Sequence, residues 1–177
     1  MTDAPNRTDP PPVADEVATL LGFLDYHRDT LRIKTAGLTG EQLGSTLPPT
    51  DMTLGGMLKH LALVEHSWFV SRFLGEEYAP PWDTVDWRAD GDWDWHSAAD
   101  DSAEELRDLW ESSVARSRAI VTDALAQGGL DQVAKRPTRT GETFSLRWIV
   151  VHMLEEYARH NGHADLLRES IDGSTGE

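Results

Sequence analysis

Residues 145–168 read SLRWIVVHMLEEYARHNGHADLLR, and their apolar side chains recur with the period of a helix. The residues that recur at three- and four-residue steps are Ile149, Met153, Tyr157, Ala164 and Leu167. Side chains three and four residues apart lie on the same face of a helix, so this pattern predicts one inward-facing apolar stripe. A fold built around such a helix needs other helices to cover the stripe.

Two polar residues, Glu156 and His160, fall within this stripe, four residues apart. Burying an acid and an imidazole costs free energy unless their polar atoms find partners. A bound metal ion would satisfy both, because a carboxylate one helical turn from a histidine is a workable ligand pair. A hydrogen bond between the two side chains without a metal is the alternative, and for an isolated Glu-x-x-x-His it is the commoner one. This helix alone leaves both interpretations open.

The composition excludes several classes of partner. The chain has 177 residues, of which 31 are acidic and 16 basic, and its formal net charge is −15 at pH 7. Such a charge argues against a nucleic-acid surface and against an anionic membrane. No apolar run approaches a membrane span and no basic-then-apolar signal opens the sequence, so we expect a cytoplasmic protein. With no cysteine in the chain, any reactive thiol would have to arrive with a substrate.

The sequence divides into a short lead, one domain and a tail. Residues 1–12 hold four prolines without apolar periodicity, and we expect them to be disordered. The span 13–173 has the length of a single domain, and residues 174–177 form a polar tail.

Four long helices are expected within the domain. Their predicted ranges are 13–35, 53–74, 102–126 and 145–171. Thr53, Ser102 and Ser145 are suitable N-caps, and Glu105 completes a capping box with Ser102. The fold class that follows is all-α, a four-helix bundle with a long loop between its second and third helices.

The second helix carries a histidine, His60, at the edge of its apolar stripe, beside Met57 and Val64. A lone histidine in this position is usually a hydrogen-bonded core residue rather than a ligand. The metal interpretation gains support because the last helix also carries polar side chains within its stripe. His27, on the first helix, is flanked by charged residues, and we expect it to be solvated.

The connection at residues 75–101 is rich in tryptophan and aspartate and lacks a helical or strand period. Its four tryptophans are Trp82, Trp87, Trp93 and Trp95. These side chains need burial, so we expect the segment to be ordered and folded over one end of the bundle, as a mobile lid or a fixed wall. Its acids lack the spacing of a calcium-binding EF-hand loop. Trp95, His96, Met57 and Val64 are the expected lining of a pocket.

Two stretches resemble a known superfamily. Residues 56–69 read GMLKHLALVEHSWF and residues 152–169 read HMLEEYARHNGHADLLRE. They resemble the second-helix and last-helix signatures of the DinB/YfiT-like metalloenzymes, in an actinobacterial branch of uncharacterised domains related to mycothiol-dependent maleylpyruvate isomerase. The resemblance extends over about residues 17–173, and it implies an up-down-down-up four-helix bundle.

The resemblance also implies a metal site. In this superfamily zinc or nickel is held by one residue of the second helix and two residues of the last helix, which here correspond to His60, Glu156 and His160. The common pattern is three histidines, whereas the maleylpyruvate isomerase branch has His, Glu, His. Three such ligands leave a coordination position open, as in catalytic zinc sites. His163 and His152 are expected to support the ligands or to substitute for one of them.

The activity implied by the resemblance is that of a metal-dependent thiol S-transferase or isomerase. Its partners would be a low-molecular-weight thiol such as mycothiol and an electrophilic substrate, and the resemblance is also compatible with a homodimer. The metal would lower the pKa of the thiol. Two alternatives stay open, a metal-dependent hydrolase and a non-catalytic metal-binding or stress-related bundle protein.

Overall fold

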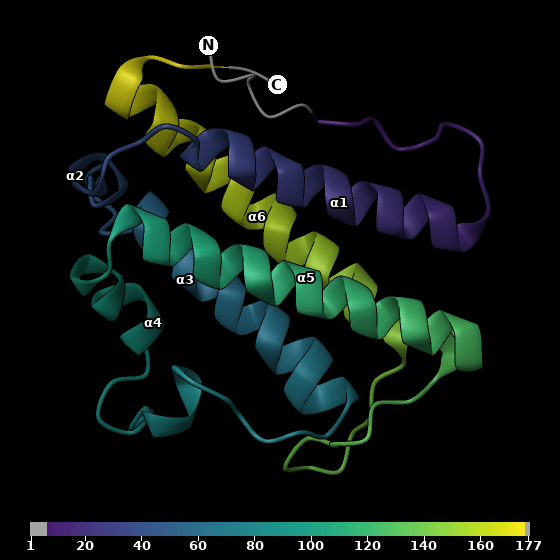
Figure 1. Ribbon diagram of the computed structural model, residues 1–177. Helices are drawn as coiled ribbons and strands as arrows, with labels where there is room; N and C mark the ends of the chain where they lie inside the picture. The colour runs from purple at the N-terminus through teal and green to yellow at the C-terminus, as the bar shows by residue number, and fades with distance from the viewer. Residues whose placement is uncertain (1–6, 176–177) are drawn as a thin grey trace.

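The computed structural model describes residues 7–175, and all its regular elements are helical, which confirms the all-α prediction (Figure 1). The four long helices are α1 (Glu16–Thr35), α3 (Leu54–Glu65), α5 (Ala103–Gln127) and α6 (Leu146–Asp172). The short α-helices are α2 (Gly40–Leu43) and α4 (Trp93–His96). A π-helix, η1 (His66–Phe73), continues α3, and the 3-10 turns are η2 (Trp82–Thr84), η3 (Ser97–Asp100) and η4 (Gly129–Asp131).

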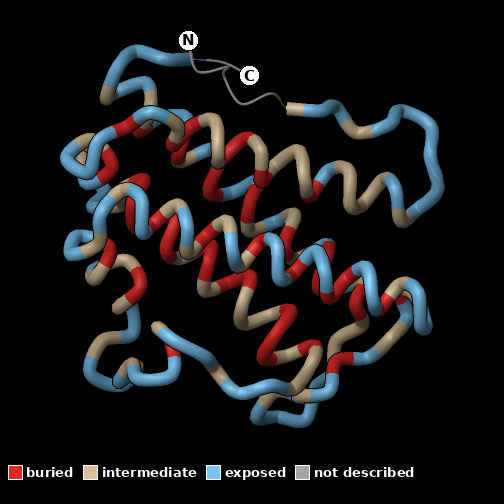
Figure 2. Tube along the Cα trace, in the orientation of Figure 1, coloured by how far each residue is buried: buried red, intermediate tan, exposed pale blue. Residues whose placement is uncertain are grey.

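The long helices lie side by side in two parallel pairs. Helix α1 packs against α6, and α3 packs against α5 and also against α6. Figure 1 shows that α1 and α6 run in one direction while α3 and α5 run in the other. Figure 2 shows that the buried residues lie on the sides of the long helices that face one another. The core is therefore a single layer of side chains between the four helices.

The predicted N-caps are confirmed. The side chains of Thr53, Ser102 and Ser145 each accept a hydrogen bond from a backbone N–H in the first turn of their helix, and Ser102 and Glu105 form the reciprocal capping box. These bonds satisfy amide groups that lack partners within the helix, which is why the helices begin where they do.

The first helix starts later than predicted. The prediction placed its start at Val13, but Val13 is 93% exposed and α1 begins at Glu16. Asp15 provides the cap, since its carboxylate accepts from the amide of Ala18. The predicted second helix, 53–74, is found as α3 followed by the wider turns of η1.

The apolar stripe of α6 is confirmed. All five residues of the predicted stripe are buried, and His160 is buried with them. Glu156, however, is half-buried at the edge of this face rather than within it. Tyr157 is fully buried beside Glu156 and takes the inward position.

One polar network joins the four long helices inside this core. Arg28 on α1 donates two hydrogen bonds to the Glu65 carboxylate on α3, at 2.8 and 2.9 Å. Tyr157 on α6 donates to the same carboxylate at 2.8 Å, and Trp110 on α5 donates its indole N–H to the Tyr157 hydroxyl at 2.9 Å. Arg28 is 2% exposed and Glu65 is fully buried.

The charges of this network balance each other. Burial on its own would lower the pKa of Arg28, but the adjacent Glu65 carboxylate raises that pKa above the ordinary value. Burial and the Glu65 charge raise the pKa of Tyr157, which stays a neutral donor. A bidentate arginine–carboxylate pair with its remaining lone pairs satisfied is the form in which buried charges are tolerated.

The tryptophan-rich segment is ordered, but it is more regular than predicted. The absence of a sequence period predicted an irregular loop over 75–101, whereas the structure has the short helical turns η2, α4 and η3 there. Trp82 is 2% exposed, and the other three tryptophans pack partly buried against the core. Helix α4 and η3 both contact α3, so the segment covers one end of that helix.

The ends of the chain are described in part. Residues 1–6 of the expected disordered lead and residues 176–177 of the polar tail lie outside the described residues. Within 7–12, Arg7 donates to the Thr30 hydroxyl at 2.9 Å and lies over the Tyr26 ring, so this part of the lead runs along α1. The division into one domain over 13–173 stays a prediction. Among residues 7–175, no helix combines the length and apolar character needed to cross a bilayer.

Replacing Glu65 with glutamine is expected to lower the free energy of unfolding by about 3 kcal/mol, because the buried Arg28 guanidinium loses its buried counter-charge and keeps only the partly exposed Asp25 at 3.1 Å. Chemical denaturation at neutral pH measures the effect. Glu169→Gln is the matched control, since it removes an exposed carboxylate from α6 and should change stability by less than about 0.5 kcal/mol. Equal stability of wild-type protein and Glu65→Gln would contradict the role assigned to the network.

Candidate metal centre

Three side chains of ligand type converge between α3 and α6. His60, Glu156 and His160 each offer one ligand atom, and these atoms all lie within 4.8 Å of one another. Glu156 and His160 meet because they are one turn apart on α6, and His60 joins them because α3 packs against α6. The structure thus brings together the three residues that the sequence singled out.

His60 is held by the tryptophan-rich segment. Its Nδ1 lies 2.7 Å from Oδ2 of Asp94 on α4, and its ring stacks on the Trp95 indole with centroids 4.8 Å apart. A carboxylate provides only acceptors, so Nδ1 is the donor of this hydrogen bond. The lone pair of His60 is then on Nε2, which is the nitrogen available to a metal.

His160 is buried and uncharged at neutral pH. Its Nε2 lies 3.7 Å from a Glu156 oxygen, and its ring meets the His60 ring edge-on at 4.9 Å between centroids. Burial lowers the pKa of His160 to about 4, and the nearby Arg159 guanidinium lowers it further. A neutral imidazole is the form that binds metals.

Glu156 does not form the plain hydrogen bond to His160 that was the alternative to a metal site. The Oε2 to Nε2 distance of 3.7 Å exceeds hydrogen-bonding range, and His160 Nδ1 is buried without a partner among the described residues. The other Glu156 oxygen lies 3.3 Å from Nε2 of His152. The carboxylate therefore faces two imidazoles and is partly exposed.

The two supporting histidines lie on either side of this group. His152 touches Glu156 and stacks on the Trp148 ring at 5.1 Å between centroids. The His163 ring lies 5.7 Å from that of His160, and its Nδ1 is buried without a hydrogen-bond partner in the described structure. Neither belongs to the group of three.

His27 is not a member of the group either, although it is less solvated than expected. It is half-buried, and burial lowers its pKa. Asn161 on α6 donates to the His27 backbone oxygen at 2.9 Å, because α1 packs against α6 at this point.

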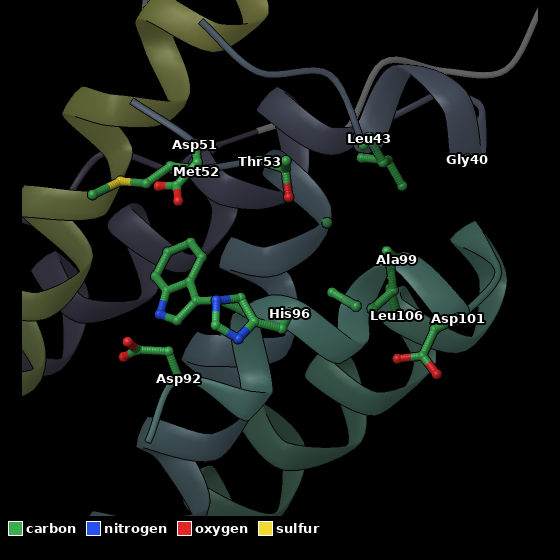
Figure 3. A pocket seen from close by; sticks show the side chains of 14 residues that line it. Gly40, Leu43, Asp51, Met52, Thr53, Asp92, His96, Ala99, Asp101 and Leu106 are labelled. Carbon is green, nitrogen blue, oxygen red and sulfur yellow. The ribbon is translucent and has the colours of Figure 1, made fainter. Parts of the chain in front are cut away.

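A cavity of about 470 Å³ lies near the N-terminal end of α3 (Figure 3), and none of the three candidate ligands is among the residues that line it. Its lining comes from α2, the start of α3, the 92–101 segment and α5. Trp95 connects the two features, since it lines the cavity and stacks on His60. His96 also lines the cavity but is exposed, and its hydrogen bond to Asp90 raises its pKa. Met57 and Val64 are buried in the core, and neither is among the residues that line this cavity.

Sequence reasoning missed Asp94. Its carboxylate is 4% exposed and pairs with a histidine 34 residues away. From the sequence, the aspartates around it are candidates only for calcium ligands, which the absence of EF-hand spacing argues against. Only the packing of α4 on α3 shows which acid of the run turns inward.

The donor set suits a divalent metal. Two imidazoles and one carboxylate, drawn from two helices of an all-helical domain, are a combination that zinc and neighbouring first-row metals accept. Among the described residues, Nε2 of His160 has no hydrogen bond, since the nearest Glu156 oxygen lies 3.7 Å away, and this nitrogen is therefore free to take a ligand. The fold and the site together define an all-helical protein with a candidate metal centre.

A family model described as Mycothiol-S-transferase matches residues 19–173, and the chain belongs to this family. The match runs from the first turn of α1 to the end of α6 and includes the tryptophan-rich segment. A search of curated proteins finds no match.

The metal-free protein is expected to lose stability as the pH falls from 6.5 toward 4. The pKa of His160 is lower in the folded chain than in the unfolded chain, so between pH 6.5 and about 4 the unfolded chain binds a proton at this position and the folded chain does not. The stability that is lost over this interval amounts to roughly 1–3 kcal/mol and is fully present above pH 6.5. Chemical denaturation across this interval, with chelator present, should give a flatter profile for His160→Gln. Superimposable stability–pH profiles of wild-type protein and His160→Gln would contradict the lowered pKa of His160.

Proposed function

We propose that this protein is a metal-dependent enzyme that transfers a low-molecular-weight thiol, mycothiol or a close relative, to an electrophilic substrate. The observation that carries the proposal is the convergence of His60, Glu156 and His160 within 4.8 Å in a chain of the Mycothiol-S-transferase family. The proposal includes a DinB-like four-helix bundle with up-down-down-up topology. The parallel pairs α1 with α6 and α3 with α5 support that topology (Figure 1).

The three residues would hold the metal through Nε2 of His60, Nε2 of His160 and the Glu156 carboxylate. Zinc is the favoured ion and nickel the second choice, because a mixed imidazole and carboxylate set accepts both. When bound, the metal supplies a Lewis acid that lowers the pKa of the substrate thiol. The chain has no cysteine, so the reacting sulfur has to come from the substrate.

The surrounding side chains orient the ligands and shape the site. Asp94 and Trp95 contact His60, and His152 contacts Glu156 at 3.3 Å. Trp95 also stands over His160, with ring centroids 5.6 Å apart, so one indole covers both imidazoles. The cavity of about 470 Å³ that Trp95 also lines is the candidate space for a substrate, and Trp95 is the residue that connects it with the ligands.

Elemental analysis of the purified protein is expected to find about one zinc or nickel ion per chain. The ion should be lost in His60→Ala and in His160→Ala, because each removes one of three ligands. His96→Ala is the control and should keep its metal, since His96 is exposed and bonded to Asp90. Wild-type protein that takes up no metal, even after incubation with zinc, would contradict the proposal and favour a bundle protein without metal chemistry.

Wild-type protein is expected to consume mycothiol in the presence of suitable electrophiles, tested as a panel and detected by mass spectrometry of the conjugate. Chelation should abolish the reaction and added zinc should restore it. Glu156→Ala should lower kcat/KM by at least about 100-fold, because it removes a metal ligand.

The product distinguishes the remaining alternatives. A conjugate that contains the thiol indicates transfer, whereas a product that contains only added water indicates a hydrolase. Metal binding without any product across the panel would identify a metal-binding protein without catalysis and would overturn the transferase proposal.

A further inference from the structure

The carboxylate of Asp94 is buried in a segment that is otherwise largely solvent-facing. Asp94 is 3% exposed, while its neighbour Asp92 is exposed and Asp90 lies partly exposed beside His96. Among the described residues, the one hydrogen bond of the Asp94 side chain goes to His60. Burying a carboxylate costs free energy unless it is paired. The hydrogen bond to the His60 imidazole is the contact that offsets this cost for Asp94.

The hydrogen bond fixes the orientation of the His60 ring. Nδ1 donates to Asp94 at 2.7 Å, so Nδ1 carries a proton and Nε2 is the nitrogen that is left to face a ligand. Stacking on Trp95 at 4.8 Å, with the planes 25° apart, limits rotation of the ring about its Cβ–Cγ bond. The two contacts together favour one orientation of the ring before any ligand binds.

The segment that carries Asp94 is itself held against α3. Gly56 permits the contact, since a Cβ at this position would lie 2.7 Å from Cε3 of Trp95. Lys59 on α3 also pairs with Asp101 and lies over the Trp93 ring at 4.6 Å. Contacts besides the bond to His60 therefore hold the chain on either side of Asp94 against α3.

We infer that Asp94 is a positioning residue of the metal centre, which directs Nε2 of His60 toward the space shared with Glu156 and His160. This inference rests on the proposed metal centre. The tryptophan-rich segment then has a role in the site, because it orients His60, the ligand that comes from α3.

The test compares Asp94→Ala and Asp94→Asn with wild-type protein in zinc affinity, measured by competition with a chromophoric chelator. Asp94→Ala should weaken zinc binding by about 10–100-fold, as loss of an orienting carboxylate does at other sites. Asp94→Asn should weaken zinc binding by less than about tenfold, because the amide oxygen still accepts a hydrogen bond from Nδ1. Asp90→Ala is the matched control, since this acid bonds exposed His96 in the same segment and should leave zinc affinity unchanged.

A second readout separates positioning from a purely structural role. Long-range proton–nitrogen NMR spectra of the metal-free proteins report which nitrogen of His60 is protonated, with His60→Gln used for assignment. Wild-type protein and Asp94→Asn should show the proton on Nδ1, and Asp94→Ala should show it on Nε2 or on both. An unchanged tautomer, or equal zinc affinity, in folded Asp94→Ala would overturn the inference. Absence of zinc binding in wild-type protein would instead overturn the metal centre itself.

Discussion

The buried ion pair between Arg28 and Glu65 is the constraint on which the arrangement of the helices depends. An unpaired charge at either position would be expensive in the core, so α1 and α3 have to meet there. Tyr157 extends the same requirement to α6, and Trp110 extends it to α5. Sliding or rotating any of the four helices by one residue would leave a buried polar group without its partner.

This network also sets the geometry of the candidate metal centre. Glu65 lies five residues after His60 on the same helix path, and Tyr157 directly follows Glu156. The 2.8 Å bond between Glu65 and Tyr157 therefore fixes the register of α3 against α6 about one turn from the site. The tryptophan-rich segment completes the arrangement from outside, since it orients the one ligand on α3. Stability and site geometry thus depend on the same few contacts.

The sequence predicted much of this arrangement because its signals are local. Helical periodicity and caps such as Ser102 located the four long helices within a few residues. The α6 pattern marked His160, which is buried in the stripe, and Glu156, which lies at its edge. His60 needed the resemblance to a known superfamily, since a histidine at a helix edge is common. Asp94, Arg28 and Glu65 could not be found in this way. Charged residues are usually exposed, and their burial here results from contacts with elements 34 and 37 residues away.

The most direct test of the metal centre is the location of a metal by anomalous diffraction from crystals of the zinc-loaded protein. One peak is expected between Nε2 of His60, Nε2 of His160 and the Glu156 carboxylate, at roughly 2.0–2.2 Å from each. His60 Nδ1 is expected to stay bonded to Asp94. A peak in the acidic segment instead, or no peak while Glu156 remains beside His152, would contradict the metal centre.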